Sequence, residues 1–395
     1  MRGKTVLVRT DLNVPMEGGR ITDQSRIMRL LPTLTMLSEQ GARVVLLSHF
    51  GRPEGKFDPS LSLAPLVDAL SAALKREVRF GVDCIGNAAR NAVNALREGE
   101  IILLENLRFH LQEESGDEAF ARELASLGEI YVNDAFSCSH RAHASITGIP
   151  RFLPSFAGML LLEEVTALSN VFSTAMRPLA AVVGGSKVST KLALLENLVS
   201  KVDVLVIGGA MANTFLHAQG IAIGRSLYEP KMARTAKGIL SAAEKAKCHI
   251  LLPADVVVAE TLCPHDPCAV CTLNDIPHGG MIADVGPVTL MHYLQTLSTC
   301  RMVVWNGPVG AFEVSPFDSG TVHLARMLAS LTRAGALQTI AGGGDTLAAI
   351  AHAGLSQAFT YLSTAGGAFL EWLEGKELPG ITALLSAPAR TLASA

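Results

Sequence analysis

Short apolar runs recur along the chain, and each is followed by a turn that contains Gly, Asn or Pro and then by a longer stretch with helical spacing. A strand that is covered on both faces reads as a continuous apolar run, so these runs predict buried strands of parallel sheets. The first half contains Thr5–Val8, Arg43–Leu47, Ile101–Leu104 and Ile130–Val132. The second half contains Leu179–Val183, Val204–Ile207, Ile250–Leu252, Met302–Val304, Thr339–Ala341 and Tyr361–Ser363. Helical spacing is clearest in Leu61–Leu74 and Thr190–Val199, and the alternation predicts an α/β fold.

A break in this pattern lies near Gly148–Pro154, where two prolines bracket three residues. The stretch Phe156–Phe172 that follows has the spacing of a long helix, which we expect to end before Pro178. A chain of 395 residues is long enough for two domains of ordinary size. We therefore expect a first domain over 1–155, a linking helix over 156–172 and a second domain over 173–377. The alternative is that the break is a loop inside one large α/β domain.

The composition narrows the class of protein. Hydrophobic residues make up 49% of the chain and charged residues 17%, which is typical of folded domains and not of disorder. The formal net charge is −3, so we expect neither nucleic acid nor a membrane surface as a partner. The uncharged stretches Val204–Gly224 and Thr346–Leu370 are too polar and too interrupted by Gly for a membrane helix. Seven cysteines, an odd number, and the lack of a signal-peptide pattern indicate a cytoplasmic protein.

In open parallel sheets ligands bind at the carboxyl ends of the strands, and in the first half these ends are rich in Arg, His and Asn. The segments that follow the four runs are Arg9–Asn13, Ser48–Pro53, Glu105–His110 and Asn133–His143. Positions 1–150 hold 14 Arg and 3 Lys, whereas the remaining positions hold 8 of each. Guanidinium groups bind carboxylate and phosphate oxygens in pairs, so this bias predicts a small polyanionic ligand. The alternative for any single Arg is a structural ion pair with an acid such as Glu105 or Asp134.

In the second half the strand ends carry glycine turns. They are Gly184-Gly185, Gly208-Gly209, Gly342-Gly343-Gly344 and Gly366-Gly367. When such a turn opens a helix, its backbone N–H groups can approach an anion closely, and four of them predict a site for nucleotide phosphates. Lys187 and Lys191 are four residues apart, and we expect both on one face of the helix after the first turn. Asp345 is a candidate magnesium ligand, and the alternative is that it caps a helix.

Two other nucleotide-binding signatures do not occur in the sequence. A P-loop is excluded because Gly3-Lys4-Thr5 lacks the upstream glycine, and a dinucleotide fingerprint is excluded because Leu347 stands at its last glycine position. These facts disfavour a P-loop enzyme and a nicotinamide oxidoreductase. A binding protein without turnover would explain the ligand-binding residues, but not the two lysines beside Asp345.

Seven motifs, in order over almost the whole chain, resemble those of the phosphoglycerate kinase family. They are VRTDLNVP (Val8–Pro15), SHFGRP (Ser48–Pro53), LLENLRFH (Leu103–His110), NDAF…HRAHAS (Asn133–Ser145), GGSKVSTK (Gly184–Lys191), WNGPVGAFE (Trp305–Glu313) and GGGDT (Gly342–Thr346). A set of seven ordered motifs is far more specific than any one of them.

The resemblance implies two doubly wound, Rossmann-like parallel-sheet domains that are joined by a hinge and flank a central cleft. It implies a monomer of glycolysis and gluconeogenesis that transfers a phosphoryl group reversibly between 1,3-bisphosphoglycerate and Mg-ADP, giving 3-phosphoglycerate and Mg-ATP. It also implies that the C-terminal tail, 378–395, packs back on the first domain.

The resemblance also implies roles for single residues. The residues implied to bind 3-phosphoglycerate are Asp11, Asn13, Arg26, His49, Arg52, Arg108, Arg141 and His143. Those implied to bind nucleotide are Gly184, Gly185, Lys191, Gly208, Gly209, Asn306, Glu313 at the ribose, Gly342, Gly343, Gly344, Asp345 and Thr346, with Asp345 also on Mg²⁺. The acceptor is a carboxylate that is already ionised at neutral pH, so transfer needs positioning and charge stabilisation and no general base. Arg26, Lys187, Gly366 and Gly367 are implied to supply that stabilisation.

One cysteine-rich segment invites interpretation as a metal site. Cys263, Cys268 and Cys271 lie near His265 and His278. A structural zinc site needs four ligands with consistent geometry, usually including a second chelating pair. We therefore expect a surface loop between strands here, without a metal.

Overall fold

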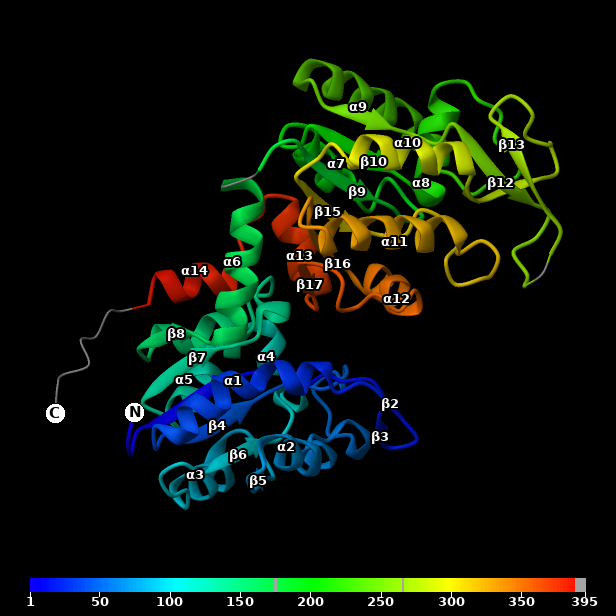
Figure 1. Ribbon diagram of the computed structural model, residues 1–395. Helices are drawn as coiled ribbons and strands as arrows, with labels where there is room; N and C mark the ends of the chain where they lie inside the picture. The colour runs from blue at the N-terminus through cyan, green and yellow to red at the C-terminus, as the bar shows by residue number, and fades with distance from the viewer. Residues whose placement is uncertain (174–175, 265, 388–395) are drawn as a thin grey trace. The chain divides into compact units, whose positions relative to one another are not determined.

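The computed structural model describes residues 1–173, 176–264 and 266–387, and within these the chain divides into two compact units. One unit comprises Met1–Thr166 together with the described chain from Glu377 onward, and the other comprises Ala167–Lys376. The division falls inside helix α6 (Met159–Ser173). Each unit has its own six-stranded sheet. Figure 1 labels strands of both sheets.

The sheet of the first unit is parallel throughout and has the strand order β5-β6-β4-β1-β7-β8. Its strands are β1 (Thr5–Arg9), β4 (Arg43–Leu47), β5 (Val78–Gly81), β6 (Ile101–Leu104), β7 (Ile130–Asn133) and β8 (Ser155–Ala157). From β1 the chain continues to β4, which lies on the side of β1 away from β7. From β7 it continues to β8, which lies on the side of β7 away from β1. Their connections therefore diverge between β1 and β7, which is where ligands bind in open sheets of this kind.

Helices cover both faces of this sheet, and the alternation of side chains along each strand builds two cores. Val8 of β1 packs in the core that contains Leu30 of α1, whereas its neighbour Leu7 packs in the core that contains Phe120 of α5. The helices of the unit are α1 (Ser25–Glu39), α2 (Val67–Leu74), α3 (Gly86–Asn94), α4 (Leu111–Ser115), α5 (Glu118–Ala125), the first part of α6, and α14 (Pro379–Leu385). A two-stranded hairpin, β2 (Met16–Glu17) and β3 (Arg20–Ile21), precedes α1.

Helix α14, the last one among the described residues, belongs to the first unit. It contacts β8 and the single turn of π-helix at Ala144–Gly148, and the Gly380 N–H donates to the Ser139 carbonyl at 2.8 Å. Figure 1 shows it in red beside strands of the first unit. Of the tail implied to pack on the first domain, residues 388–395 lie outside the described residues.

The main sheet of the second unit is also parallel, with the strand order β11-β10-β9-β15-β16-β17. Its strands are β9 (Leu179–Val183), β10 (Val204–Ile207), β11 (His249–Leu251), β15 (Met302–Asn306), β16 (Gln338–Gly342) and β17 (Tyr361–Ser363). The helices are α7 (Leu192–Val199), α8 (Gly209–Ala218), α9 (Ala233–Ala246), α10 (Pro287–Leu297), α11 (Ser319–Arg333), α12 (Gly344–His352) and α13 (Gly366–Leu373). Val182 of β9 packs in one core with Leu324 of α11 and Tyr293 of α10.

A second, antiparallel sheet with the strand order β13-β12-β14 is attached to this unit. Its strands are β12 (Asp255–Ala259), β13 (Cys268–Thr272) and β14 (Met281–Val285). Helix α10 begins just after it, and the Asp255 carboxylate accepts the N–H groups of Val288 (3.0 Å) and Thr289 (2.7 Å) in the first turn of α10.

The predicted α/β fold with two parallel sheets is confirmed, and each predicted apolar run forms a strand within a residue or two of its expected bounds. The sequence patterns did not reveal β5, β8 or the antiparallel sheet. The helix expected over Leu61–Leu74 is wrong in its first part, where two short 3-10 turns, Pro59–Leu61 and Ala64–Leu66, precede α2.

The helix expected over Phe156–Phe172 is wrong at its start. Phe156 pairs with Val132 in strand β8, and α6 begins only at Met159. Gly158 separates the two elements, because its N–H donates to the Asn133 carbonyl at 2.8 Å and an added Cβ would lie 2.2 Å from an oxygen of Asp134. Among the described residues, no helix is both long and apolar enough to span a membrane.

Candidate functional site

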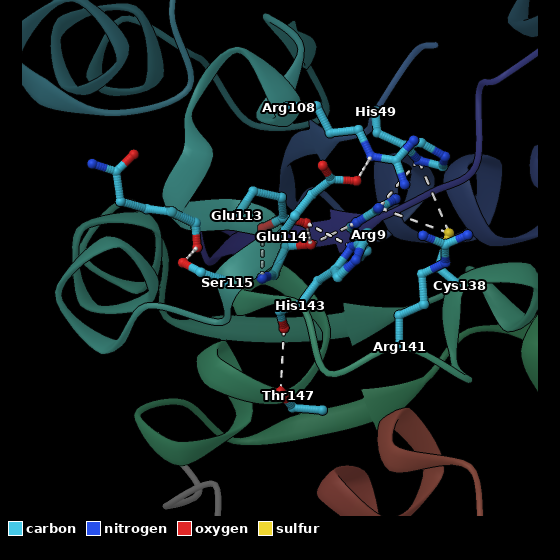
Figure 2. Close-up of polar contacts among 12 residues, drawn as sticks. Arg9, His49, Arg108, Glu113, Glu114, Ser115, Cys138, Arg141, His143 and Thr147 are labelled. Carbon is cyan, nitrogen blue, oxygen red and sulfur yellow. Dashed lines mark hydrogen bonds and ion pairs between the residues drawn. The ribbon is translucent and has the colours of Figure 1, made fainter. Parts of the chain in front are cut away.

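The carboxyl ends of β1, β4, β6 and β7 bring basic side chains together in the first unit (Figure 2). Arg9, the last residue of β1, is the innermost of them and is 1% exposed. Its Nε donates to Ser145 Oγ at 2.8 Å, and a terminal nitrogen lies 3.2 Å from Nδ1 of His49. A buried guanidinium that is held by hydrogen bonds gives this end of the sheet a fixed positive charge.

His49 follows β4 and is 7% exposed. Burial and the charge of Arg9 lower the pKa of His49 well below its usual range, so the ring is neutral at physiological pH. Because a guanidinium can only donate, Nδ1 of His49 accepts from Arg9 and the ring proton lies on Nε2. His49 therefore offers one N–H donor, which suits an anionic oxygen.

Asp11 is buried two residues beyond β1 and forms an ion pair with Arg26 at the start of α1. Its carboxylate also accepts from Ser137 Oγ, and from the Asn13 N–H at 3.0 Å. Burial alone would raise the pKa of Asp11, but the Arg26 guanidinium and these hydrogen bonds lower the pKa below its usual range. The ionised Asp11 thus holds the Arg26 guanidinium close to the end of β1.

Arg108 lies in a 3-10 turn, Leu107–Phe109, just after β6. The Asn106 carboxamide fixes this turn, because its oxygen accepts the Arg108 N–H at 3.0 Å and the Phe50 N–H at 3.1 Å. The Arg108 guanidinium donates to the Gly51 carbonyl at 2.7 Å and forms an ion pair with Glu114 at 3.0 Å. Arg108 therefore links the segments that follow β6 and β4.

His143 and Arg141 complete the cluster from the segment after β7. His143 is 7% exposed, and burial together with Arg9, Arg108 and Arg141 lowers its pKa to about 3, so it is neutral. Its Nδ1 lies 3.8 Å from the Glu113 carboxylate. The Nε of Arg141 donates to the ring of His140 at 3.2 Å.

Two further residues of the expected set lie at the surface. Arg52 and Asn13 are exposed, and the Asn13 side-chain oxygen accepts the Gly51 N–H at 2.9 Å. Contacts through Gly51 thus connect Arg108 with Asn13, and Asn13 in turn contacts Asp11, the partner of Arg26. His49 contacts Arg9. Among the described residues, none forms a hydrogen bond or ion pair with the Arg52 guanidinium.

The groups that hold this cluster in place were not predictable from the sequence pattern. The chief one is Glu113 of α4, which is fully buried and accepts the N–H and the hydroxyl of Ser145 at 2.9 and 2.5 Å. Burial raises the pKa of Glu113, while Arg9 and Ser145 favour its charged form. The pattern of polar positions gives no signal for such a residue, because Glu113 sits in the acidic run Glu113-Glu114, which reads as an exposed helix surface.

In the second unit, glycine turns line one side of a cavity of about 290 Å³. Residues from these turns and from the small sheet contribute to it, including Gly185, Gly209, Asp284, Glu313 and Asp345. The turns pack backbone on backbone. An added Cβ at Gly184 would lie 1.8 Å from the Pro308 carbonyl, and Gly209, with φ +66°, approaches the Gly185 carbonyl. Glycine is therefore required for these segments to meet.

Lys191 spans the turns that follow β9 and β15. Its Nζ donates to the Gly184 carbonyl at 2.6 Å, to the Asn306 carbonyl at 3.2 Å and to the Asn306 side-chain oxygen at 2.6 Å. Burial lowers the pKa of Lys191 to about 8, and Asp345 opposes that shift. The ammonium is thus held at the carboxyl edge of the sheet, beside the cavity.

The expectation that Lys187 and Lys191 share a helix face is wrong. Helix α7 begins at Leu192, so both lysines lie in the turn before it, where Lys187 is exposed and Lys191 is half-buried. For the same reason Gly184-Gly185 does not open a helix, and the expected helix Thr190–Val199 starts two residues late. The other three glycine turns do open helices, namely α8, α12 and α13.

The starts of α12 and α13 lie close together. The Cβ position of Gly366 would be 4.0 Å from the Gly344 nitrogen, and no other heavy atom outside its neighbours lies within that distance. Gly343 caps α12 with φ +99°, against the side chain of Asn306, which donates to the Gly342 carbonyl at 2.9 Å. The Thr346 hydroxyl accepts the Gly307 N–H at 2.7 Å. Two helix N-termini therefore lie close together, and the first backbone N–H groups of a helix have no partner within that helix.

Asp345 fits a divalent cation by the chemistry of its donors. It is exposed in the first turn of α12 and lines the cavity, and its carboxylate has no hydrogen bond or ion pair recorded with the residues that the structure describes. Hard cations such as Mg²⁺ bind one or two carboxylates and complete their shell with phosphate oxygens and water.

The cysteine-rich segment differs from expectation. Cys268 and Cys271 lie on strand β13 and not in a loop, while His265 lies outside the described residues. A separate group of three side chains lies in the first unit. Within the described chain, Asp83, Cys84 and His110 form the one such group whose metal-ligating atoms lie close together. Burial and Asp83 raise the pKa of the Cys84 thiol well above its usual range, and His110 is hydrogen-bonded to Asp83 at 2.8 Å. Both facts favour a protonated thiol and a structural pair.

Comparisons with known proteins agree with these motifs. Residues 1–376 match the family model described as phosphoglycerate kinase. A curated protein named phosphoglycerate kinase from Methylobacterium radiotolerans is 54% identical over 384 residues, which is 97% of this chain and 96% of that protein. One from Zymomonas mobilis is 53% identical over 97% of each. The solved structure of phosphoglycerate kinase from Coxiella burnetii has a TM-score of 0.90 and 44% identity, covering 97% of this chain and 96% of that one. The corresponding values for the enzyme from Pyrococcus horikoshii are 0.79 and 31%, with the same coverage.

Proposed function

Because this chain belongs to the phosphoglycerate kinase family, we propose that its first unit binds 3-phosphoglycerate and its second unit binds the nucleotide. The enzyme transfers a phosphoryl group reversibly between 1,3-bisphosphoglycerate and ADP, giving 3-phosphoglycerate and ATP, a step of glycolysis and gluconeogenesis. The proposal rests on one observation: the two units present different kinds of ligand-binding groups. Buried guanidinium and imidazole groups gather in the first unit. In the second unit, glycine turns line a cavity, and the Lys191 ammonium is hydrogen-bonded to one of these turns.

In the first unit the phosphate and the carboxylate of 3-phosphoglycerate are bound by donors around the end of β1. The proposed ligands are Asp11, Asn13, Arg26, His49, Arg52, Arg108, Arg141 and His143. The neutral rings of His49 and His143 add N–H donors without further charge, and the guanidinium groups supply the charge. Asp11 accepts from a substrate hydroxyl and keeps Arg26 in place.

In the second unit the nucleotide lies along the glycine turns. Gly184, Gly185, Gly208, Gly209, Lys191, Asn306, Gly342, Gly343, Gly344 and Thr346 are the proposed contacts to it, with Glu313 at the ribose. Asp345 would hold Mg²⁺. When bound, that ion neutralises phosphate charge and links the phosphates to the protein.

The chemical step needs little from the protein beyond placement and charge. The acceptor carboxylate of 3-phosphoglycerate is ionised at neutral pH, so it attacks phosphorus without a general base. The bond to the leaving oxygen of ADP breaks as the new bond to the carboxylate forms. Arg26, Lys187 and the backbone N–H groups of Gly366 and Gly367 stabilise the charge on the transferring group. Since these groups belong to different units, we propose that the hinge closes to bring the substrates together and exclude water.

Further properties belong to the same proposal. We propose that the enzyme works as a monomer, since each unit carries its own substrate site. We also propose a cytoplasmic location, where the other reactions of glycolysis occur and where seven cysteines would stay reduced.

Alanine variants of the two proposed catalytic cations test the assignment. Removing one fixed donor to the transferring group costs a few kcal/mol, so we expect Arg26→Ala or Lys187→Ala to lower turnover by at least ~10². The measurement is a coupled assay of ATP consumption with 3-phosphoglycerate. The matched controls are Arg20→Ala in the hairpin and Lys237→Ala on α9, both exposed, which should keep full activity. Either catalytic variant with near-normal turnover and a normal melting temperature removes that residue from the assignment.

A further inference from the structure

A carboxylate outside the sites described so far is hydrogen-bonded to the lysine turn, by which we mean residues 186–191 between β9 and α7. Glu229 precedes a 3-10 turn at Pro230–Met232. One of its oxygens accepts the Ser189 N–H at 2.9 Å, and the other accepts the Ser189 hydroxyl. The Val188 N–H also contributes a hydrogen bond. A carboxylate that accepts several donors from one turn restricts that turn to a single position.

Glu229 is itself held by the body of the unit. Its own N–H donates to Thr214 Oγ1 at 3.1 Å, and Thr214 is fully buried in α8. Its carbonyl accepts the Met232 N–H at 3.0 Å. The link therefore runs from the packed helix α8 through Glu229 to the lysine turn.

The lysine turn is otherwise held mainly by Val188 and Lys191. Val188 is fully buried, and the Lys191 ammonium binds the Gly184 carbonyl and Asn306. Lys187, which precedes Val188, is exposed, and so are Ser189 and Thr190, which lie between Val188 and Lys191. The Thr190 hydroxyl donates to the Lys187 carbonyl at 2.9 Å. Without the hydrogen bonds to Glu229, only Val188 and Lys191 would restrain this turn. The backbone at Lys187 would then shift as the exposed residues rotate.

From this arrangement we propose that Glu229 is a positioning residue: its carboxylate fixes the lysine turn so that Lys187 meets the transferring phosphoryl group. The inference rests on the proposed function of Lys187. A displacement of about 1 Å in a group that stabilises a transition state can lower the rate about a hundredfold. Glu229 acts on the rate through Lys187 and contributes little to binding of 3-phosphoglycerate.

The test uses the full-length enzyme with Glu229→Ala and Glu229→Gln. We expect Glu229→Ala to lower kcat roughly ten- to hundredfold with KM for 3-phosphoglycerate nearly unchanged. We expect a smaller loss for Glu229→Gln, which keeps one acceptor oxygen. Hydrogen exchange gives a readout that does not depend on catalysis, because the Val188 and Ser189 amides should exchange faster in both variants. Glu244→Ala removes an exposed carboxylate on α9 and serves as the control for all three measurements.

A double-mutant cycle with Ser189→Ala adds a second test, since the losses in kcat should be less than additive if both residues act through one contact. Unchanged exchange at Val188 and Ser189 in Glu229→Ala would overturn the inference, and so would faster exchange with unchanged kcat when Lys187→Ala is inactive. If Lys187→Ala itself retains full kcat, the proposed function of Lys187 fails, and Glu229 loses its role in positioning a catalytic group.

Discussion

At the scale of single residues, the second unit places a cation in a setting that disfavours its charge. Lys191 is half-buried, and its ammonium is surrounded by the Gly184 carbonyl and two oxygens of Asn306. These dipoles hold the side chain in place, but burial still lowers its pKa to about 8. In mildly alkaline solution, part of the free enzyme therefore carries a neutral Lys191 amine. A change in the charge of Lys191 on binding can then be measured as a proton that is taken up.

Lys191 predicts that nucleotide binding takes up a proton at alkaline pH. Bound phosphates would raise the pKa of the ammonium above about 8, so at about pH 9 binding of Mg-ADP should be coupled to proton uptake, and at about pH 6.5 it should not. Calorimetry in buffers of different ionisation enthalpy measures this uptake. Lys191→Arg stays charged at both pH values and should abolish the difference. Equal uptake in the wild type and Lys191→Arg at about pH 9 would show that another group is responsible.

At the scale of elements, the glycine turns carry more structural constraint than their length suggests. The turn after β9 packs directly on the turn after β15, since a Cβ at Gly184 would overlap the Pro308 carbonyl and one at Gly307 would overlap the Gly184 carbonyl. Lys191 bonds both turns from one side. The cavity wall is thus a backbone contact between two strand ends, and side chains cannot replace it.

A pair of Gly→Ala variants separates this packing from ordinary helix propensity. We expect Gly184→Ala to lower the free energy of unfolding by about 1–3 kcal/mol or more and to weaken nucleotide binding, because the added methyl has no room against backbone. Gly238→Ala lies within α9 with no atom within 4 Å of its Cβ position, so it should raise the stability by about 0.5–1 kcal/mol. Chemical denaturation with the two variants in parallel measures both values. A neutral Gly184→Ala would show that the turns can separate at little cost.

The elements also show why part of the structure was predictable from sequence. Strands such as β1 and β9 are buried along their whole length, so their runs are apolar and unmistakable. Strand β13 is the exposed edge of a small sheet, and its sequence CAVCT therefore lacks a buried face to signal it. Among the residues of the candidate site, those at strand ends could be proposed from their position after an apolar run. Glu113 and Glu229 were not, because each acts through hydrogen bonds to a segment distant in sequence.

At the scale of the whole molecule, the proposed reaction needs residues of both units, and each unit has its own sheet and its own core. Arg26 belongs to the first unit and Lys187 to the second. Proteins that bind two substrates on separate units transfer a group between them only after closure. The proposed closure would therefore be detected as a change in the overall dimensions of the molecule when both substrates bind.

Closure predicts that the radius of gyration depends on which substrates are present. We expect X-ray scattering to give a smaller radius with 3-phosphoglycerate and a non-hydrolysable Mg-ATP analogue together than with either one alone. Each single-ligand sample is the control for the effect of binding itself. An identical radius in all states would count against a closing mechanism and leave the chemistry of the separate units unaffected.

The position of α14 has a consequence for how the enzyme is made. The first unit is assembled from both ends of the polypeptide, with Gly380 bonded to Ser139 and Leu378 almost fully buried. A ribosome has to synthesise the entire second unit before it delivers α14. The nascent first unit therefore stays incompletely covered while the second unit is synthesised, and its contacts with α14 form only after that.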